Sequence, residues 1–410
     1  MQTWLDVPDG SPFPLTNLPY GVVSRGGGRP HVAVAIGDHA LSLAAAANTG
    51  LLDDALRDED LGVVHRDVFD APSLNRFLAL GRPLWTAVRR RVTELLTGPE
   101  YGSALRSALV PLADLRCHLP VEVADYVDFY SFEAHARSLG GYLRPGQPPL
   151  MPNWKRLPIG YHGRAGTVVP SGTDVVRPSG QRLTDGEPVF GPSRRLDIEA
   201  EVGFVVGTPS RAGTRVSTVD FAEHVFGAVL VNDWSARDIQ GFENAPLGPF
   251  LGKSFATSVS PWVVPLDALA AARVAPPAQD PVPADYLRPA GDGYALSLAV
   301  QWNRTTVSHP PFAAMYWTPA QQLAHLTANG ASLRTGDLYA SGTVSGDGAE
   351  ARGSFIELSD NGTAPVTLAG GETRTFLADG DTVAITATAP GADGTTIGFG
   401  EVTGRILPAI

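Results

Sequence analysis

The chain has 410 residues, of which 43% are hydrophobic and 18% charged, and this composition excludes a disordered or fibrous protein. Its 45 glycines and 35 prolines make up about a fifth of the sequence, which argues against an all-helical bundle and indicates many turns and ordered loops. The formal net charge of −11 argues against a general binder of nucleic acid or of anionic membranes.

The cellular compartment is predicted from three features. The single cysteine, Cys117, excludes an internal disulfide, so the fold does not depend on an oxidising environment. The first ten residues, MQTWLDVPDG, lack a basic segment followed by an apolar core, so no signal peptide is expected. No stretch approaches the roughly 18 uninterrupted apolar residues of a membrane span. We therefore expect a soluble, cytoplasmic protein that is long enough for two or three domains, or for one small module on a large one.

The first part of the chain predicts a small mixed unit. Apolar alternation over residues 31–36 and the following Gly37-Asp38 predict a β-hairpin. Apolar residues recur at helical spacing over 83–97. This helix carries the run Arg89-Arg90-Arg91, which in an acidic chain indicates a solvated face with one snorkelling arginine and not a phosphate site. We place a domain boundary near residue 118.

From residue 119 onward, strand-like runs alternate with long loops rich in proline and glycine. The runs with β-rich composition or alternation are RLDIEAEVGFVVG (195–207), ALSLAVQWNR (295–304), GSFIELS (353–359) and DTVAITATA (381–389). One helix is well bounded, because Thr318 is placed as its N-cap, Pro319 as its first residue and Gly330 beyond its end. The second unit is therefore expected to be mainly β.

The segment 196–202 carries acids at alternate positions. A strand would place Asp197, Glu199 and Glu201 on one face and apolar residues on the other. Neighbouring like charges repel, and a divalent cation among them would remove that cost. Oxygen ligands favour Ca²⁺ or Mg²⁺. The alternative is an exposed polar strand face.

A second candidate lies where the apolar run 227–231 ends at Asn232-Asp233 and leads into a predicted short helix. A carboxylate at the end of a buried strand is well placed as a further metal ligand. Arg237 and Gln240 would then be donors near the same point. The alternative is helix capping by Asp233 and a surface ion pair for Arg237.

Two further segments carry ionisable groups. Ser131 has the position of an N-cap, so Asp128 would be a ligand in a loop and His135 a general base on a helix, unless His135 is structural. Lys253 lies in an apolar loop stiffened by glycine and proline, and if buried it needs an anionic partner. Gly252-Lys253-Ser254 resembles the end of a P-loop, but the upstream glycine is too close and no strand-to-helix pattern surrounds it.

Taken together, these segments resemble the fumarylacetoacetase family, which catalyses the last step of tyrosine and phenylalanine breakdown. The resemblance covers nearly the whole chain and is closest from about residue 119 to 410. It rests on DFYSFEAHARSLG, PNWKRLPIGYHGR, RLDIEAEVGFVVG, VNDWSARDIQ, PLGPFLGKSF, MYWTPAQQL and DLYASGTVSG. It implies an α+β, mainly β fold with a small SH3-like barrel over 1–118 and a catalytic β-roll domain over 119–410, assembled as a homodimer.

The resemblance also implies a metal centre and catalytic groups. The implied carboxylate ligands are Asp128, Glu199, Glu201 and Asp233, holding Ca²⁺ or Mg²⁺, with Mn²⁺ also acceptable and no organic cofactor. His135 would be the general base, oriented by Glu357. The donors around the developing oxyanion would be Arg237, Gln240 and Lys253.

The implied substrate contacts are Tyr130, Arg144, Tyr161, Gln240, Asn244 and Thr343. Asn244 departs from the family, which has a tyrosine there, so its aromatic surface and phenol are lost. Lys253 and Thr257 match positions that the family assigns to Mg²⁺. A protonated ammonium cannot ligate a cation, so we expect Lys253 to act through its charge.

The implied reaction is hydrolysis of a carbon–carbon bond in a small diketo acid, 4-fumarylacetoacetate, to give fumarate and acetoacetate. The alternative within the superfamily is an acylpyruvate hydrolase or a keto-diacid decarboxylase or isomerase. A catalytically silent metal-binding scaffold is the rival from another class, and it predicts losses among the site residues. His135, Glu357 and Lys253 are all present. Neither a nucleic-acid nor a membrane partner is expected.

Overall fold

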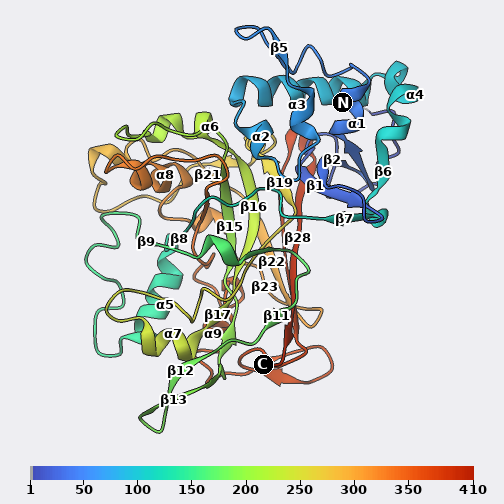
Figure 1. Ribbon diagram of the computed structural model, residues 1–410. Helices are drawn as coiled ribbons and strands as arrows, with labels where there is room; N and C mark the ends of the chain where they lie inside the picture. Colours follow the sequence, from blue (N-terminus) through green and yellow to red (C-terminus); the bar gives the residue numbers. More distant parts are fainter. Residues whose placement is uncertain (1–2) are drawn as a thin grey trace.

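One large mixed sheet organises the molecule in the computed structural model, which describes residues 3–410 (Figure 1). Within these residues the sheet has thirteen strands, and its main path runs β6-β3-β2-β1-β19-β16-β15-β24-β8-β9. Strand β7 joins it at β1, and β18 joins it at β16 and carries β10. No helix in the described part of the chain is long and apolar enough to cross a membrane.

The strands of this sheet come from widely separated segments between residues 20 and 340. They are β1 (Tyr20–Arg25), β2 (His31–Ile36), β3 (His39–Ser42), β6 (Leu109–Pro111), β7 (Leu115–Cys117), β8 (Tyr126–Phe129), β9 (Gly160–His162), β10 (Val168–Pro170), β15 (Ala200–Val206), β16 (Val225–Asp233), β18 (Thr257–Val259), β19 (Trp262–Pro265) and β24 (Leu338–Ala340). Short two-stranded pairs lie outside it: β4 (Arg57–Asp58) with β5 (Val63–Val64), β12 (Ser179–Thr184) with β13 (Glu187–Pro192), β14 (Leu196–Asp197) with β17 (Ser235–Ala236), β20 (Arg273–Val274) with β21 (Gly293–Tyr294), and β25 (Val366–Thr367) with β26 (Thr373–Arg374).

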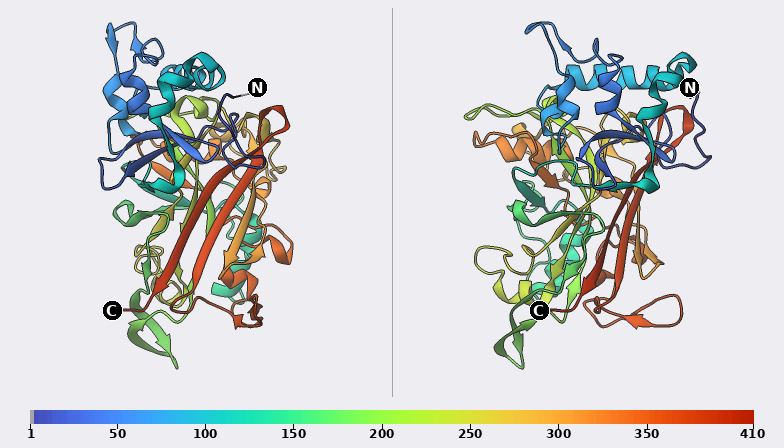
Figure 2. Two further views of the ribbon diagram at one scale, coloured as in Figure 1. Left: turned by 90° about the vertical axis from the view of Figure 1, so that its right-hand side faces the viewer. Right: turned by 45° about the vertical axis from the view of Figure 1, so that its right-hand side comes forward.

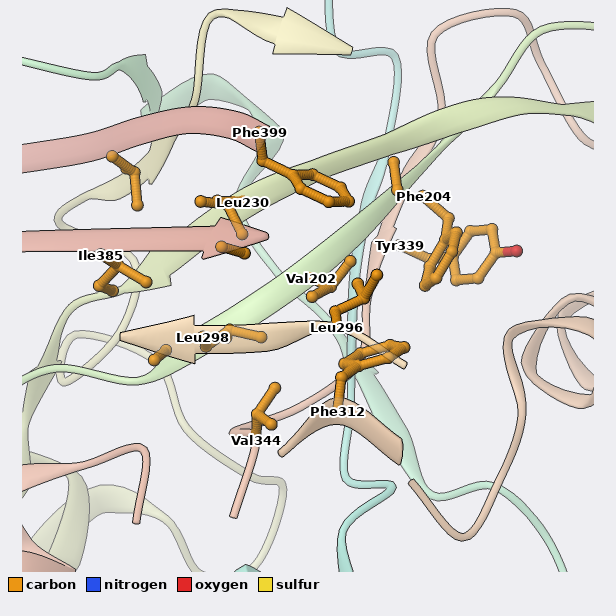
Figure 3. Packing of buried hydrophobic residues seen from close by; sticks show 14 of the residues in the cluster. Val202, Phe204, Leu230, Leu296, Leu298, Phe312, Tyr339, Val344, Ile385 and Phe399 are labelled. Atoms are coloured by element: carbon orange, nitrogen blue, oxygen red, sulfur yellow. The ribbon is translucent and has the colours of Figure 1, made fainter. Parts of the chain in front are cut away.

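A second sheet supplies the other wall of the main core. Its order is β11-β28-β27-β22-β23, and its strands are β11 (Val175–Val176), β22 (Ser297–Trp302), β23 (Thr305–Ser308), β27 (Thr382–Pro390) and β28 (Thr396–Leu407). Figure 2 shows its longest strands, β27 and β28, running side by side along the molecule. Val202, Phe204 and Leu230 of the large sheet pack in one buried cluster with Leu298, Ile385 and Phe399 of the second sheet (Figure 3).

The main core predicts a large effect for one substitution. Phe204 is 1% exposed and packs against Tyr339 and Phe312 at centroid distances of 5.6 and 6.3 Å. Phe204→Ala is expected to lower the free energy of unfolding by about 3–5 kcal/mol, because it leaves a cavity among rings that cannot close over it. Urea denaturation measures this loss. Phe190→Ala, at a ring 72% exposed, is the control and is expected to change it little; equal losses in both variants would contradict this packing.

Helices cover the large sheet at the N-terminal end. The α-helices among residues 3–410 are α1 (Leu43–Asn48), α2 (Asn75–Leu78), α3 (Arg82–Thr97), α4 (Gly102–Leu105), α5 (Glu133–Leu143), α6 (Phe221–His224), α7 (Arg237–Glu243), α8 (Pro319–Thr327) and α9 (Phe355–Leu358). Val88 and Val92 of α3 belong to the same buried cluster as Val205 and Val229 of the central strands. Strands β15 and β16 are therefore buried on both faces, which explains their nearly continuous apolar sequence.

The local sequence signals predicted several elements correctly. The hairpin of β2 and β3 and the helix α3 are confirmed. Thr318 caps α8 as predicted, with a reciprocal hydrogen bond pair to Gln321. In the arginine run, Arg89 is half-buried and donates to the carbonyls of Thr16 and Asn17, and Arg91 is 25% exposed and donates to the Leu51 carbonyl. Only the Arg90 side chain, 75% exposed, is solvated, so the predicted solvated face with a single inward arginine is correct only in part.

The predicted strand over 353–359 is wrong, because this segment forms helix α9. The Asp197 carboxylate accepts hydrogen bonds from the amides of Phe355 and Ile356 at 2.7 and 3.1 Å. These are orphan donors of the first helical turn, and an acid there stabilises a helix start. The determinant lies far away in the sequence, so β-rich composition alone is misleading here.

Candidate active site

The central strands of the large sheet place four polar side chains on one face. Each lies two or four residues along its strand from a side chain of the buried cluster that also contains residues of α3, and alternate residues of a strand share a face. The pairs are Asp128 with Tyr126 in β8, Glu201 with Val205 in β15, Asp233 with Val231 in β16 and Thr257 with Val259 in β18. Asp233 lies directly opposite Thr257 in the ladder. The polar cluster therefore continues an apolar face at the strand ends.

Three carboxylates meet closely at this position. Asp128, Glu199 and Asp233 each offer an oxygen, these atoms lie within 4.8 Å of one another, and all three residues are buried. Asp128 lies in β8 and not in a loop as predicted, because β8 extends to Phe129 beside β24. Glu201 extends from the same face. Its Oε2 accepts from the Gly342 amide at 3.2 Å.

The segment 196–202 is not one continuous strand as predicted. It breaks at Ile198 and Glu199, whose amides donate to the side chains of Asp197 and Asn232 instead of to a ladder partner. Asp197, Glu199 and Glu201 are all buried, which excludes the exposed polar face. The Asp197 carboxylate accepts hydrogen bonds from Arg237 and from the first turn of α9, so its oxygens are already occupied and are not free to bind a metal.

Two buried cations lie against the acids. Lys253 Nζ donates to Glu199 Oε2 at 2.5 Å and to Asp233 Oδ2 at 2.7 Å. Arg237 Nη1 donates to Glu199 Oε1 at 2.7 Å and Nε to Asp197 Oδ2 at 2.8 Å. Asp233 does not cap α7, whose N-cap is Ala236, and Arg237 is buried, so its ion pairs are not at the surface. Burial alone would lower the pKa of Lys253, but Asp233 and Glu199 outweigh it and raise that pKa, so the ammonium stays protonated.

The cluster carries more negative than positive charge. Five buried carboxylates (Asp128, Asp197, Glu199, Glu201, Asp233) face two buried cations, Lys253 and Arg237. Burial raises the pKa of Asp128 and of Glu201, and neighbouring carboxylates raise both further. Oxygens Oδ1 of Asp128 and Oε1 of Glu201 have no hydrogen-bond partner among residues 3–410. Unpartnered carboxylate oxygens in a site of excess negative charge fit a hard divalent cation.

His135 lies beside this cluster, on the first turn of α5. Its Nδ1 is 2.7 Å from Glu357 Oε2, and its Nε2 is 3.7 Å from Glu199 Oε1. Burial alone would lower the pKa of His135, but Glu357 and Glu199 outweigh it and raise the pKa to about 9. Burial alone would raise the pKa of Glu357, but His135 and the hydroxyls of Ser354 and Ser345 lower it. An ionised Glu357 only accepts, so Nδ1 carries the proton and Nε2 faces the cluster.

The residues expected to contact substrate differ in how close they lie to the cluster. Tyr161 donates to Asp233 Oδ2 at 3.2 Å, and the Tyr130 ring meets the His135 ring edge-on at 5.6 Å. Gln240 Oε1 accepts from Arg237 at 3.1 Å. Arg144 Nε, Thr343 Oγ1 and Arg237 Nη2 are buried without a partner among residues 3–410. Asn244 is the C-cap of α7, and its side chain forms no hydrogen bond to the described residues.

A cavity of about 230 Å³ opens next to Asp233 and Lys253. Its walls come from β8, β9, the loop after β9, the loop before β18 and β18 itself. The lining side chains include Tyr126, Tyr161, His162, Arg164, Phe250, Lys253, Ser254 and Thr257. Asp233 is the member of the carboxylate cluster that lines this hollow, which is large enough for a small organic molecule.

The sequence matches the family described as "Fumarylacetoacetate (FAA) hydrolase C-terminal" over residues 126–407, and the one described as "Fumarylacetoacetase N-terminal" over residues 16–120. The chain belongs to the fumarylacetoacetate hydrolase family. The predicted family and the mixed, sheet-rich α+β fold are therefore confirmed.

Members of this family are similar to the chain along its full length. It is 47% identical to the fumarylacetoacetase of Caenorhabditis elegans, covering 100% of both chains, and 45% identical to that of Homo sapiens, covering 100% of this chain and 99% of the other. Among solved structures, the fumarylacetoacetate hydrolase from Exiguobacterium antarcticum matches with a TM-score of 0.56 at 15% identity over 95% of this chain and 99% of that one. At this identity the structural match shows the fold alone.

Sequence reasoning missed several residues of the site. Ser131 does not cap α5: the cap is Phe132, and Ser131 Oγ accepts from Gln322 at 2.8 Å. Tyr126 was not singled out, although its position two before Asp128 is the signal that could have found it. Its hydroxyl is buried without a partner among residues 3–410. Ser345 and Ser354, which hold Glu357, gave no signal.

Proposed function

We propose that this chain hydrolyses the carbon–carbon bond of 4-fumarylacetoacetate to give fumarate and acetoacetate. One observation carries the proposal: a buried His135–Glu357 pair faces a buried carboxylate cluster at 3.7 Å. Full-length relatives at 41–47% identity that are named fumarylacetoacetase support the substrate. The reaction needs a base for water, a positive site for the diketone and donors for an oxyanion, and this cluster offers groups for each.

We assign the metal centre to Asp128, Glu199, Glu201 and Asp233, and the ion to Ca²⁺ or Mg²⁺, with Mn²⁺ also acceptable. The unpartnered oxygens of Asp128 and Glu201 support this assignment. When bound, the cation supplies positive charge that polarises the two keto oxygens and favours an enolate leaving group. Lys253 contributes charge and not a ligand atom, because its raised pKa keeps it an ammonium. Thr257 fixes Asp233 by donating to Oδ1 at 3.0 Å.

The proposed base is His135. Nδ1–H donates to Glu357, so Nε2 is the nitrogen that accepts a proton from water when the imidazole is neutral. A cation bound by Glu199 would offset one of the charges that raise the pKa of His135 and so favour this neutral form. The water oxygen attacks the carbonyl carbon on the fumaroyl side. The bond from that carbon to the neighbouring methylene then breaks, and the electron pair moves into the acetoacetate half. His135, now protonated, returns its proton to the methylene carbon of the acetoacetate half, which becomes the methyl group of acetoacetate.

The proposed oxyanion donors are Arg237, Gln240 and Lys253. Arg237 Nη2 has no partner among the described residues, and Gln240 uses its oxygen on Arg237, which leaves its amide N–H groups to donate. One such donor is typically worth about 3–4 kcal/mol of the barrier. Substrate contacts are assigned to Tyr130, Arg144, Tyr161, Asn244 and Thr343; the unpartnered Arg144 Nε and Thr343 Oγ1 support this.

The finer organisation belongs to the same proposal. We assign residues 1–118 to an SH3-like barrel and 119–410 to a β-roll catalytic domain. The antiparallel run β6-β3-β2-β1 with β7 on β1 supports a small barrel, although β1 also pairs with β19 of the second unit. We further propose a homodimer, and a cytoplasmic location on the ground of the single, unpaired cysteine.

The test is loss of ultraviolet absorbance when the purified protein meets fumarylacetoacetate or shorter acylpyruvates. We expect cleavage of fumarylacetoacetate with the higher kcat/KM, and fumarate and acetoacetate as products. Cleavage of the shorter acids alone would favour an acylpyruvate hydrolase, and loss of CO₂ or double-bond migration would favour a decarboxylase or an isomerase. Failure to turn over any of these substrates would support the alternative of a catalytically silent metal-binding scaffold.

A further inference from the structure

The cavity beside Asp233 contains one charged side chain that the proposed chemistry does not use. Among its donors, Lys253, Tyr161 and Thr257 all donate to Asp233. Arg164, an exposed residue, also lines the cavity, and its guanidinium has no hydrogen bond or ion pair to any of residues 3–410. A cation at a cavity wall without an acceptor is available to an anionic ligand.

The loop that carries Arg164 is fixed by the strands of the carboxylate cluster. Tyr161, three residues before it, lies opposite Asp128 in the β8–β9 ladder, and Val168, four residues after it, lies opposite Thr257. The Gly163 amide donates to the Tyr126 carbonyl at 2.8 Å. A Cβ at Gly163 would lie 2.2 Å from the Tyr126 ring, so only glycine allows this close approach. The position of Arg164 is therefore set by the same elements that hold the acids.

The other ionic groups of the cavity compensate each other. Lys253 is paired with Asp233, and His162 Nδ1 lies 3.3 Å from Asp125. Arg164 is left as the uncompensated charge. The Tyr126 hydroxyl, buried and unpartnered among the described residues, adds a neutral donor to the same walls. An arginine with a nearby hydroxyl is a donor set that suits a carboxylate.

The proposed substrate is a dicarboxylate, with one carboxylate at each end of the diketone chain. Arg144, assigned to substrate by the proposed function, lies at the C-terminal end of α5 and is not among the residues that line this cavity. The second carboxylate therefore needs another cation on the Asp233 side of the cluster. Arg164 meets this requirement by position and by its lack of a partner.

We propose that Arg164 is a specificity-determining residue, which binds one terminal carboxylate of the diacid substrate in this cavity with the Tyr126 hydroxyl as a second donor. This inference rests on the proposed function for its substrate. It assigns to one residue the preference for a dicarboxylate over a monocarboxylic acylpyruvate.

Steady-state kinetics of Arg164→Gln test it. We expect KM for fumarylacetoacetate to rise about tenfold or more, because a charge-assisted, bidentate contact is lost, while kcat stays within about twofold. Arg164→Lys should recover part of the affinity, since it keeps the charge but not the fork. The matched control is Arg211→Gln, at an exposed arginine outside the cavity, and it should leave both constants unchanged. An unchanged KM in Arg164→Gln would overturn the proposal.

A binding measurement distinguishes the two ends of the substrate without turnover. Calorimetric titration of the Mg²⁺-loaded protein with fumarate and, separately, with acetoacetate gives each affinity in wild type and Arg164→Gln. Loss of affinity for fumarate assigns Arg164 to the fumaroyl end, and loss for acetoacetate assigns it to the other end. Retention of both affinities would contradict the proposal. A wild type that fails to cleave fumarylacetoacetate would instead refute the proposed function, so the two failures are distinguishable.

Discussion

Replacing His135 with alanine is expected to lower kcat about 10²–10⁴-fold, the range by which general bases accelerate proton transfer. The variant removes the only histidine within reach of both Glu357 and Glu199 among residues 3–410. Fold and cation affinity should persist, because the acids of the cluster and the apolar faces beneath them remain. Steady-state kinetics, thermal unfolding and calorimetric titration with Mg²⁺ measure the three quantities separately.

Two comparison variants sharpen this result. Glu357→Gln keeps an oxygen that accepts from Nδ1 but loses the charge that stabilises a protonated imidazole, so its kcat should fall less than that of the alanine variant. His309→Ala, at an exposed histidine, should match the wild type. Near-full activity in His135→Ala would show that another group takes the proton from water. A fall in cation affinity equal to the fall in kcat would show a structural role.

Replacing Asp128 with asparagine is expected to weaken Mg²⁺ or Ca²⁺ binding by at least about 100-fold. Substituting a residue that only supports a metal ligand typically lowers metal affinity about 10–100-fold, and substituting a direct ligand should lower it at least as much. In chelator the same substitution should raise the midpoint of thermal unfolding. Burial and the neighbouring carboxylates raise the pKa of Asp128, so its ionised form destabilises the empty fold, and asparagine removes that repulsion.

The two expected effects of Asp128→Asn, weaker cation binding and a higher unfolding midpoint in chelator, distinguish a metal ligand from an ordinary buried acid. In wild type, adding the cation should raise the unfolding midpoint, because the ion binds the folded state. Asp381→Asn is the control, since Asp381 is also buried but donors from Trp302 and Asn303 occupy its oxygens. It should lower stability and leave cation affinity unchanged. A lower midpoint of Asp128→Asn in chelator would contradict the excess negative charge of the cluster.

Local sequence patterns predicted the elements whose determinants lie within a few residues. The capping box of α8 and the apolar spacing of α3 are of this kind, and both elements form as expected. Helix α9 has a different cause, because Asp197 accepts from its first amides across 158 positions of the sequence. No window of local sequence contains that interaction, which is why the segment was predicted as a strand.

The candidate site shows the same division. The alternation of acids identified Asp197, Glu199 and Glu201 as a group. The break at Ile198 separates Asp197, which is held by Arg237 and α9, from the other two acids. The pairing of His135 with Glu357 joins two helices far apart in the chain, and spacing alone gave no sign of it. Only the resemblance to a known family linked these residues before the structure was considered.

The central claim is that the buried carboxylate cluster holds a divalent cation on which carbon–carbon hydrolysis depends. The most direct test is turnover of fumarylacetoacetate by the purified protein after exhaustive chelation, and again after Mg²⁺ or Ca²⁺ is restored. We predict that chelation abolishes the loss of substrate absorbance and that the restored ion recovers it. Undiminished turnover by protein whose metal content is shown by elemental analysis to be negligible would contradict the claim.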